Sequence, residues 1–227
     1  MASYSCQHLQ KVIMKKPISN NLRGGLVTAP ILYLKNVKNI DEASLEKVKS
    51  VEIDSVGKAL CEHFDNHSNC TLTGVYNLLS FYRDAEGFSD IPAQSDRLYG
   101  TIRKVGDRYG YNYEREKGIP VYNNRRFLKA VLKDFGHSDK RVTAEYMVPA
   151  GRATKLLDAG IPFLLSIAYG IYFNHTITVY GYETYRDRNT GRTYTFLIIN
   201  DEWSAERRYL PWTHLERFRI TCLTRIV

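Results

Sequence analysis

The sequence predicts an α+β fold, in which a mostly helical N-terminal portion is followed by an antiparallel β-sheet. Before Gly160, apolar residues recur at helical spacing in several stretches. After Gly160 the pattern changes to apolar runs, alternation and β-branched or aromatic residues, with a turn-forming stretch at 187–191 that is typical of a hairpin. The strands are expected at residues 161–172, 175–182, 192–200 and 218–227.

The first part of the chain carries weaker signals. Residues 28–37 alternate enough to predict a short strand or an extended arm. Residues 41–63 are expected to be helical, because Asp41 can cap a helix and Leu45 and Val48 follow with near-helical spacing.

The central helices have clearer apolar patterns. The stretch at 85–94 contains Gly, Pro and Asp and is expected to be a loop. Helices are predicted at residues 70–83, 95–109, 123–135 and 153–159.

Composition indicates a globular protein with ample core. The chain has 227 residues, 44% of them hydrophobic and 25% charged, which is ordinary for a soluble domain. No run of about 18 apolar residues occurs, so we expect no membrane partner. The N-terminus lacks a continuous apolar segment, which predicts a cytoplasmic protein unless a leader has been removed. The four cysteines, at positions 6, 61, 70 and 222, are sparse and irregularly spaced, which favours reduced thiols over a disulfide framework.

The net charge of +8 would suit an acidic partner or nucleic acid. The basic residues are dispersed, however, apart from a modest concentration in residues 97–141. No recognition helix, zinc-finger spacing or stacking-aromatic motif accompanies them. We therefore expect a mildly basic surface and no nucleic-acid partner.

Cys70 is the candidate nucleophile. It stands at the end of a polar, turn-prone run, residues 65–69, and directly before an apolar pattern of helical spacing that includes Val75, Leu78 and Leu79. That order places the sulfur on the first turn of a buried helix. Unpaired N–H groups and the helix dipole favour a thiolate there, and the thiolate is the reactive form.

His175 and Asp201 are the candidate base and orienting residue. His175 opens one predicted strand, and Asp201 follows the end of the next. In an antiparallel hairpin the start of one strand lies beside the end of its neighbour. The carboxylate of Asp201, or the amide of Asn200, would then hold the imidazole and leave its other nitrogen to face the sulfur. Trp203 could cover the pair and exclude water.

Four segments carry a family resemblance. They are Asn69-Cys70-x-x-Thr73 with Asn77-Leu78-Leu79, the apolar stretch 156–167, His175-Thr-Ile-Thr-Val-Tyr-Gly-Tyr182, and Asn200-Asp201-Glu202-Trp203. Together they resemble papain-like cysteine peptidases, in the branch similar to bacteriocin-leader (double-glycine) processing peptidases. The likeness spans roughly residues 65–210, in the family's order of cysteine, histidine and aspartate.

The resemblance implies a papain-like fold, with the cysteine helix packed on the C-terminal sheet and the active site in the cleft between them. It implies thiol-dependent hydrolysis of a peptide or isopeptide bond in a peptide or protein substrate, with no cofactor. Cys70, His175 and Asp201 would form the catalytic triad. The peptidase domain would cover residues 58–227. Residues 1–57 match nothing in the family, and would be an N-terminal extension or an integral part of the fold.

Two departures concern the oxyanion hole. Thr71-Leu72 follow the cysteine where the family commonly has Gly-Pro, and phenylalanine occupies position 64, with no glutamine nearby to donate a hydrogen bond. Asn66, Asn69 or the Cys70 backbone N–H would have to supply the donors. Because losing one donor typically costs about 10²–10³ in turnover, the alternative is a catalytically inactive papain-like module that binds a peptide or partner protein.

Other interpretations of the same residues remain open. Cysteine is among the most buried residue types, so Cys70 could be structural. Cys61, His63, His67 and Cys70 are also residue types that bind zinc at compact spacing. Zinc ligands normally lie in turn-rich knuckles, whereas Cys61 and His63 fall in a predicted helix, and we expect no metal site.

Overall fold

The computed structural model describes residues 27–64, 68–168, 172, 174–212 and 220–227. The helices within these residues are α2 (Pro30–Lys38), α3 (Cys70–Ala85), α4 (Ser95–Arg108), α5 (Asn124–Asp134) and α6 (Ala150–Asp158). The strands are β1 (Leu45–Glu52), β2 (Val142–Tyr146), β3 (Phe163–Ile167), β4 (His175–Asp187), β5 (Thr193–Asn200), β6 (Arg208–Pro211) and β7 (Thr221–Ile226). No helix among the described residues is long and apolar enough to cross a membrane.

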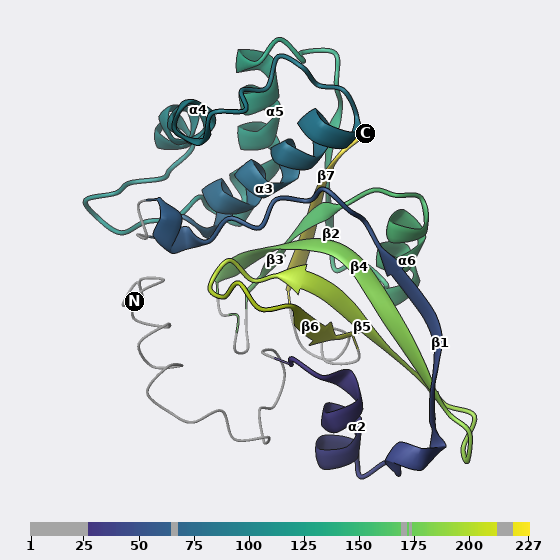
Figure 1. Ribbon diagram of the computed structural model, residues 1–227. Coiled ribbons are helices and arrows are strands. Elements are labelled where there is room, and N and C mark those ends of the chain that lie inside the picture. Colours follow the sequence, from purple (N-terminus) through teal and green to yellow (C-terminus); the bar gives the residue numbers. More distant parts are fainter. Residues whose placement is uncertain (1–26, 65–67, 169–171, 173, 213–219) are drawn as a thin grey trace.

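The strands form one antiparallel sheet with the order β2-β7-β3-β4-β5-β6 (Figure 1). The long strand β4 organises it. Its first residues pair with β3, from Ile167↔His175 to Phe163↔Val179, while its last residues pair with β1. On its other edge β4 pairs with β5 along most of its length. This arrangement places the start of β4 in the middle of the sheet.

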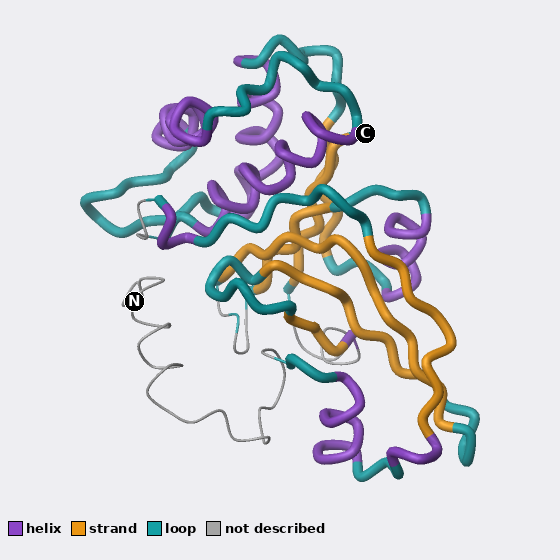
Figure 2. Tube along the Cα trace, in the orientation of Figure 1, coloured by secondary structure: helices purple, strands orange, loops and turns teal. Residues whose placement is uncertain are grey.

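Helices cover both faces of the sheet, so the molecule is layered (Figure 2). The helices α3, α4 and α5 share a core with Leu164 and Tyr180 of the sheet. On the opposite face, Leu156 and Leu157 of α6 pack with Phe163 and Ile177. A strand that is buried on both faces carries mostly apolar residues, which explains the nearly continuous apolar character of β3.

The helix α3 lies unusually deep, because most of its residues are buried, including those on its polar side. Gly74 permits this close approach to the sheet. A Cβ atom added there would lie 2.8 Å from Oε1 of Glu202 and 3.0 Å from Cδ2 of Leu164. The residue one turn after Cys70 must therefore be small for the helix to sit against the sheet.

The structure confirms the predicted α+β class and the predicted helices at 70–83, 95–109, 123–135 and 153–159, with shifts of a few residues at their ends. It also confirms the hairpin turn after β4, where the Gly191 N–H donates to the Asp187 carbonyl at 2.7 Å. The short strands β2 and β6 were not expected. Both are edge strands of four or five residues, too short for a clear alternating pattern.

The two predictions for the first part of the chain are wrong. Residues 28–37 mostly form the helix α2, which begins at Pro30, a residue suited to the first helical position. Within residues 41–63, predicted as a helix, the main element is the strand β1. A bulge between Lys47 and Lys49 inserts one residue in β1. The bulge moves the next residues to the other face, so that Leu45 packs against one core and Val51 against the other.

Candidate active site

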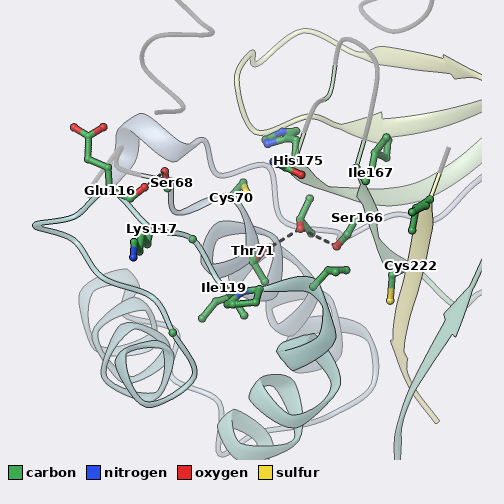
Figure 3. Close-up of a pocket in the computed structure, with 18 of the residues that line it drawn as sticks. Ser68, Cys70, Thr71, Glu116, Lys117, Ile119, Ser166, Ile167, His175 and Cys222 are labelled. Atoms are coloured by element: carbon green, nitrogen blue, oxygen red, sulfur yellow. Dashed lines mark hydrogen bonds between the residues drawn. The ribbon is translucent and has the colours of Figure 1, made fainter. Parts of the chain in front are cut away.

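A cavity of about 400 Å³ opens between the start of α3, the start of β4 and the loop at 110–121. Cys70 and His175 both line it, although they are 105 positions apart in the chain. Figure 3 shows Cys70 at the beginning of its helix and His175 at the beginning of its strand, on adjoining walls of the cavity. The structure thus brings the predicted nucleophile and base to one site.

Cys70 is the first residue of α3, as the sequence predicts, and its side chain is buried. The preceding residue, Asn69, is fully buried and does not face the cavity. Its side-chain amide donates to the Cys61 carbonyl and to the Tyr99 hydroxyl, both at 3.1 Å. Both amide hydrogens are therefore used in holding the segment before α3, which argues against Asn69 as an oxyanion donor. Asn66 lies outside the described residues.

His175 is buried, with 4% of its surface exposed. Its Nε2 atom lies 2.7 Å from the backbone carbonyl oxygen of Asp201. A carbonyl oxygen only accepts hydrogen bonds, so Nε2 must carry the hydrogen and, in the neutral ring, Nδ1 holds the lone pair. Burial disfavours the charged ring and lowers the pKa of His175 to about 4, although the hydrogen bond to Asp201 opposes this effect.

Asp201 lies beside His175, but its carboxylate makes different contacts from those expected. Oδ1 accepts from the backbone N–H groups of Trp203 and Ser204, both at 3.1 Å, and Oδ2 accepts from the Tyr172 hydroxyl at 3.4 Å. Burial raises the pKa of this carboxyl group. The orienting contact therefore comes from the main chain of Asp201, because the turn that follows it captures the side chain.

Trp203 covers the imidazole as expected. Its ring is stacked on that of His175, with ring centroids 4.0 Å apart and an interplanar angle of 24°. Tyr172 is stacked on Trp203, at 5.3 Å and 26°. Trp203 also packs against Cys61 and Cys70. The indole thus contacts both candidate catalytic side chains.

Asn200, the alternative orienting residue, points elsewhere. Its amide donates to the carbonyls of Gly57 and Ala59 at 3.4 and 3.3 Å, and its Oδ1 accepts from the Glu202 N–H at 2.8 Å. These bonds tie the end of β5 to the segment before α3. Asn200 is therefore a structural residue of the site's surroundings.

The missing glutamine is replaced by aromatic packing. The ring of Phe64 is stacked on Tyr99 with centroids 3.8 Å apart. Ser68, which lines the cavity, donates its hydroxyl to the Glu116 carbonyl at 2.7 Å. Among the oxyanion donors expected from the sequence, the backbone N–H of Cys70, the first residue of α3, stays a prediction.

The zinc alternative gains no support from the described residues, among which no group of three or more His, Cys, Asp or Glu side chains could hold a metal ion. His67 lies outside them. His63 accepts a hydrogen bond from the Leu60 N–H through Nδ1. Cys61 is buried against Cys70 and Trp203.

Sequence reasoning missed the hydroxyl groups of the cavity. Thr71, Ser166 and Thr176 line it and are joined by hydrogen bonds of 2.9 Å. Thr71 directly follows Cys70 and Thr176 directly follows His175, and this adjacency was the sequence signal that could have indicated them.

A cysteine at the start of a buried helix, packed on an antiparallel sheet that carries the histidine, defines a papain-like fold. The sequence matches the model of the Peptidase_C39 like family over residues 59–219, more than half of the chain, and the protein belongs to this family. A comparison with curated proteins finds no match. Membership supports a peptidase-type function that acts on a peptide or protein.

Proposed function

We propose that the protein is a thiol-dependent hydrolase of peptide or isopeptide bonds, with Cys70 as nucleophile and His175 as general base and acid. The observation that carries this proposal is that both residues line one cavity, with the imidazole held as the Nε2–H tautomer. This tautomer offers Nδ1 to the thiol, since Nε2 is bonded to the Asp201 carbonyl.

In the proposed reaction, Nδ1 removes the proton from the Cys70 sulfur as the sulfur attacks the scissile carbonyl. The oxyanion of the tetrahedral intermediate accepts a hydrogen bond from the backbone N–H of Cys70 at the N-terminus of α3. The protonated His175 then gives its proton to the departing amine, which leaves an acyl-enzyme. Water attacks this thioester with His175 again acting as base, and the acid product departs.

The low pKa of His175 defines the resting state of this pair. At neutral pH the ring is uncharged, since its pKa is about 4. The proposed enzyme therefore starts with a neutral imidazole, and the proton moves during the attack. Burial is the cause of the low pKa, and the indole of Trp203, stacked on the ring, is part of what buries it.

Thiol alkylation combined with a peptidase assay tests the proposal. Iodoacetamide should modify Cys70 much faster than Cys61, which is fully buried outside the cavity, and faster than Cys222, which also lines the cavity but whose thiol pKa is raised by burial. The modification should abolish cleavage of a peptide library. Cys70→Ala and His175→Ala should each abolish cleavage, while Cys222→Ala should retain it. Cleavage that survives in Cys70→Ala would refute the assignment.

The second candidate is a catalytically inactive module that binds a peptide or partner protein. The position of Phe64, stacked on Tyr99 where the family's glutamine would donate, favours it. In that case wild type and Cys70→Ala would bind the same peptides with the same affinity, and neither would cleave them.

We also propose a reducing, cytoplasmic location. Three of the four cysteines are described, and no disulfide joins them. Reduced thiols persist in such compartments.

A further inference from the structure

A chain of hydrogen-bonded side chains crosses the bottom of the cavity. Asn124 of α5 donates to the Ser166 hydroxyl of β3 at 2.9 Å. Ser166 is bonded to Thr176 of β4, and Thr176 to Thr71 of α3, each at 2.9 Å. The dashed lines in Figure 3 follow these bonds from Thr71 to Ser166. These hydrogen bonds thus connect α5, β3, β4 and α3.

This hydroxyl chain, defined as Thr71, Thr176 and Ser166, lies next to the proposed reacting groups. Thr71 follows Cys70 and Thr176 follows His175. All three hydroxyl residues line the cavity and are almost fully buried, with at most 7% of their surface exposed. A substrate bound at Cys70 would place a neighbouring side chain over them.

Counting hydrogens shows what the hydroxyl chain offers a ligand. Its three hydroxyls hold three hydrogens, of which two are used in the two bonds between them. Ser166 also accepts from Asn124. One O–H donor is therefore left over, on whichever of the three hydroxyls donates in neither bond. The Asn124 Oδ1 atom, at the far end, is buried and has no hydrogen-bond partner among the described residues.

The rest of the cavity is apolar close to the hydroxyl chain. The side chains of Ile119, Pro120, Ile167 and Ile220 contribute to its walls. The charged lining residues, Glu116 and Lys117, come from the 110–121 loop, and Figure 3 shows both on the side of the cavity away from the hydroxyl chain. A charged side chain would lose water there without gaining an opposite charge. A purely apolar one would leave the spare O–H donor without a partner.

We propose that the hydroxyl chain and the apolar walls beside it form a subsite that selects a carboxamide group of the substrate. The carboxamide is the side chain of a glutamine or asparagine adjacent to the scissile bond. The carboxamide oxygen accepts the spare hydrogen of the hydroxyl chain, and its NH₂ group donates to hydroxyl oxygens. The aliphatic stem packs between the apolar walls. This inference rests on the proposed function for its chemistry, because only a hydrolase places a scissile bond at Cys70.

Matched peptides test the selection. In internally quenched peptides that the enzyme cleaves, each position beside the scissile bond is varied between Gln, its apolar counterpart Met and its charged counterpart Glu. At one position, kcat/KM should favour Gln over both by at least about 10-fold, because a site built to hydrogen-bond a group discriminates against analogues that lack it. Equal values for Gln and Met at every position would overturn the inference.

Variants assign the selection to the hydroxyl chain. Thr176→Val and Ser166→Ala should each bring the ratio of kcat/KM for the Gln peptide to kcat/KM for the Met peptide close to 1. Thr176→Ser keeps the hydroxyl at this position and should show the preference for Gln that Thr176→Val lacks. The control is Thr184→Val, which should keep the preference for Gln. Thr184 is on the same strand as Thr176, but its hydroxyl is bonded to Thr195 outside the cavity. A preference that persists in Thr176→Val and Ser166→Ala would also overturn the inference.

The outcomes separate this inference from the proposed function. Cys70-dependent cleavage without a Gln preference refutes the subsite and leaves the hydrolase standing. If no peptide is cleaved, the hydrolase fails, and calorimetric binding of the Gln and Met peptides to the wild-type chain then tests the subsite. Tighter binding of the Gln peptide that is lost in Thr176→Val supports it, and equal binding refutes it.

Discussion

The orientation of His175 depends on a main-chain oxygen. A side-chain carboxylate can rotate, whereas the Asp201 carbonyl is fixed by the turn that follows it, in which Oδ1 of the same residue accepts from the N–H groups of Trp203 and Ser204. The side chain of Asp201 thus acts indirectly, by holding its own backbone in place. This makes Asp201 a positioning residue: the turn that holds its carbonyl needs the side chain as a hydrogen-bond acceptor, while the charge of the carboxylate faces the buried guanidinium of Arg208, whose Nε lies 3.9 Å from Oδ2.

Asp201→Asn should therefore have only a mild effect on activity. The asparagine carbonyl can accept the same two N–H bonds, so we expect kcat/KM to fall by less than about 10-fold, compared with the roughly 10⁴-fold loss when an orienting carboxylate of a Ser-His-Asp triad is replaced by an amide. Asp201→Ala removes the turn's acceptor and should cost more than Asp201→Asn. Steady-state kinetics with both variants measure the difference, and a drop of about 10³ or more in Asp201→Asn would show that the carboxylate itself orients the ring.

The burial of His175 also determines how activity depends on pH. The neutral ring is the active base, so activity should fall as pH decreases through its pKa of about 4, well below the 6.5 of an exposed histidine. Trp203→Leu removes the stacked indole and admits water, which should move the acidic limb of kcat/KM towards 6.5. The pH profile reports this shift separately from any loss of folding. An unchanged acidic limb in Trp203→Leu would mean that the indole does not set the pKa of the ring.

Among the elements, the contact between α3 and the sheet is the one that places the nucleophile. At Gly74 the helix approaches Glu202 and Leu164 so closely that a Cβ atom has no room. Gly100 of α4 is also helical, but a Cβ atom there would meet nothing within 4 Å. The two glycines therefore form a natural pair for separating helix propensity from packing.

Gly100→Ala should stabilise the protein by about 0.5–1 kcal/mol, because alanine loses less backbone entropy in a helix. Gly74→Ala gains the same propensity but must displace buried neighbours, and overpacking of this kind costs about 1–3 kcal/mol. We expect a net destabilisation and a loss of activity from the displaced Cys70. Urea denaturation measures both, and a stabilised Gly74→Ala protein would contradict the packing argument.

The helices and strands also show which parts of the fold the sequence can predict. Long amphipathic helices such as α4 and α5 were predicted because their periodicity is local. β1 was missed because a bulge at Val48 disguises its alternation, and the bulge depends on pairing with β4, which follows more than a hundred residues later. The same limit applies to the site. Cys70, His175 and Trp203 follow from motifs, whereas the carbonyl contact of Asp201 and the hydroxyl chain depend on how four elements pack.

For the molecule as a whole, the buried neutral His175 links folding to pH. The native ring binds a proton with a pKa of about 4, whereas the unfolded chain binds one near 6.5. Between these values the unfolded state holds more protons, so acid favours unfolding. Asp201 acts in the opposite direction, because burial raises its native pKa and its contribution to stability is lost as pH rises through that value.

Comparing wild type with His175→Gln isolates the histidine, because the contribution of Asp201 is common to both. As pH falls from 6.5 towards 4, the free energy of unfolding of wild type should decrease relative to the variant by up to about 1.4 kcal/mol for each pH unit. Above pH 6.5 the difference should be constant, since the ring is neutral in both states. Urea unfolding curves at a series of pH values give the difference directly. Parallel curves throughout this range would mean that His175 titrates normally in the folded protein, and the neutral-base mechanism would lose its physical basis.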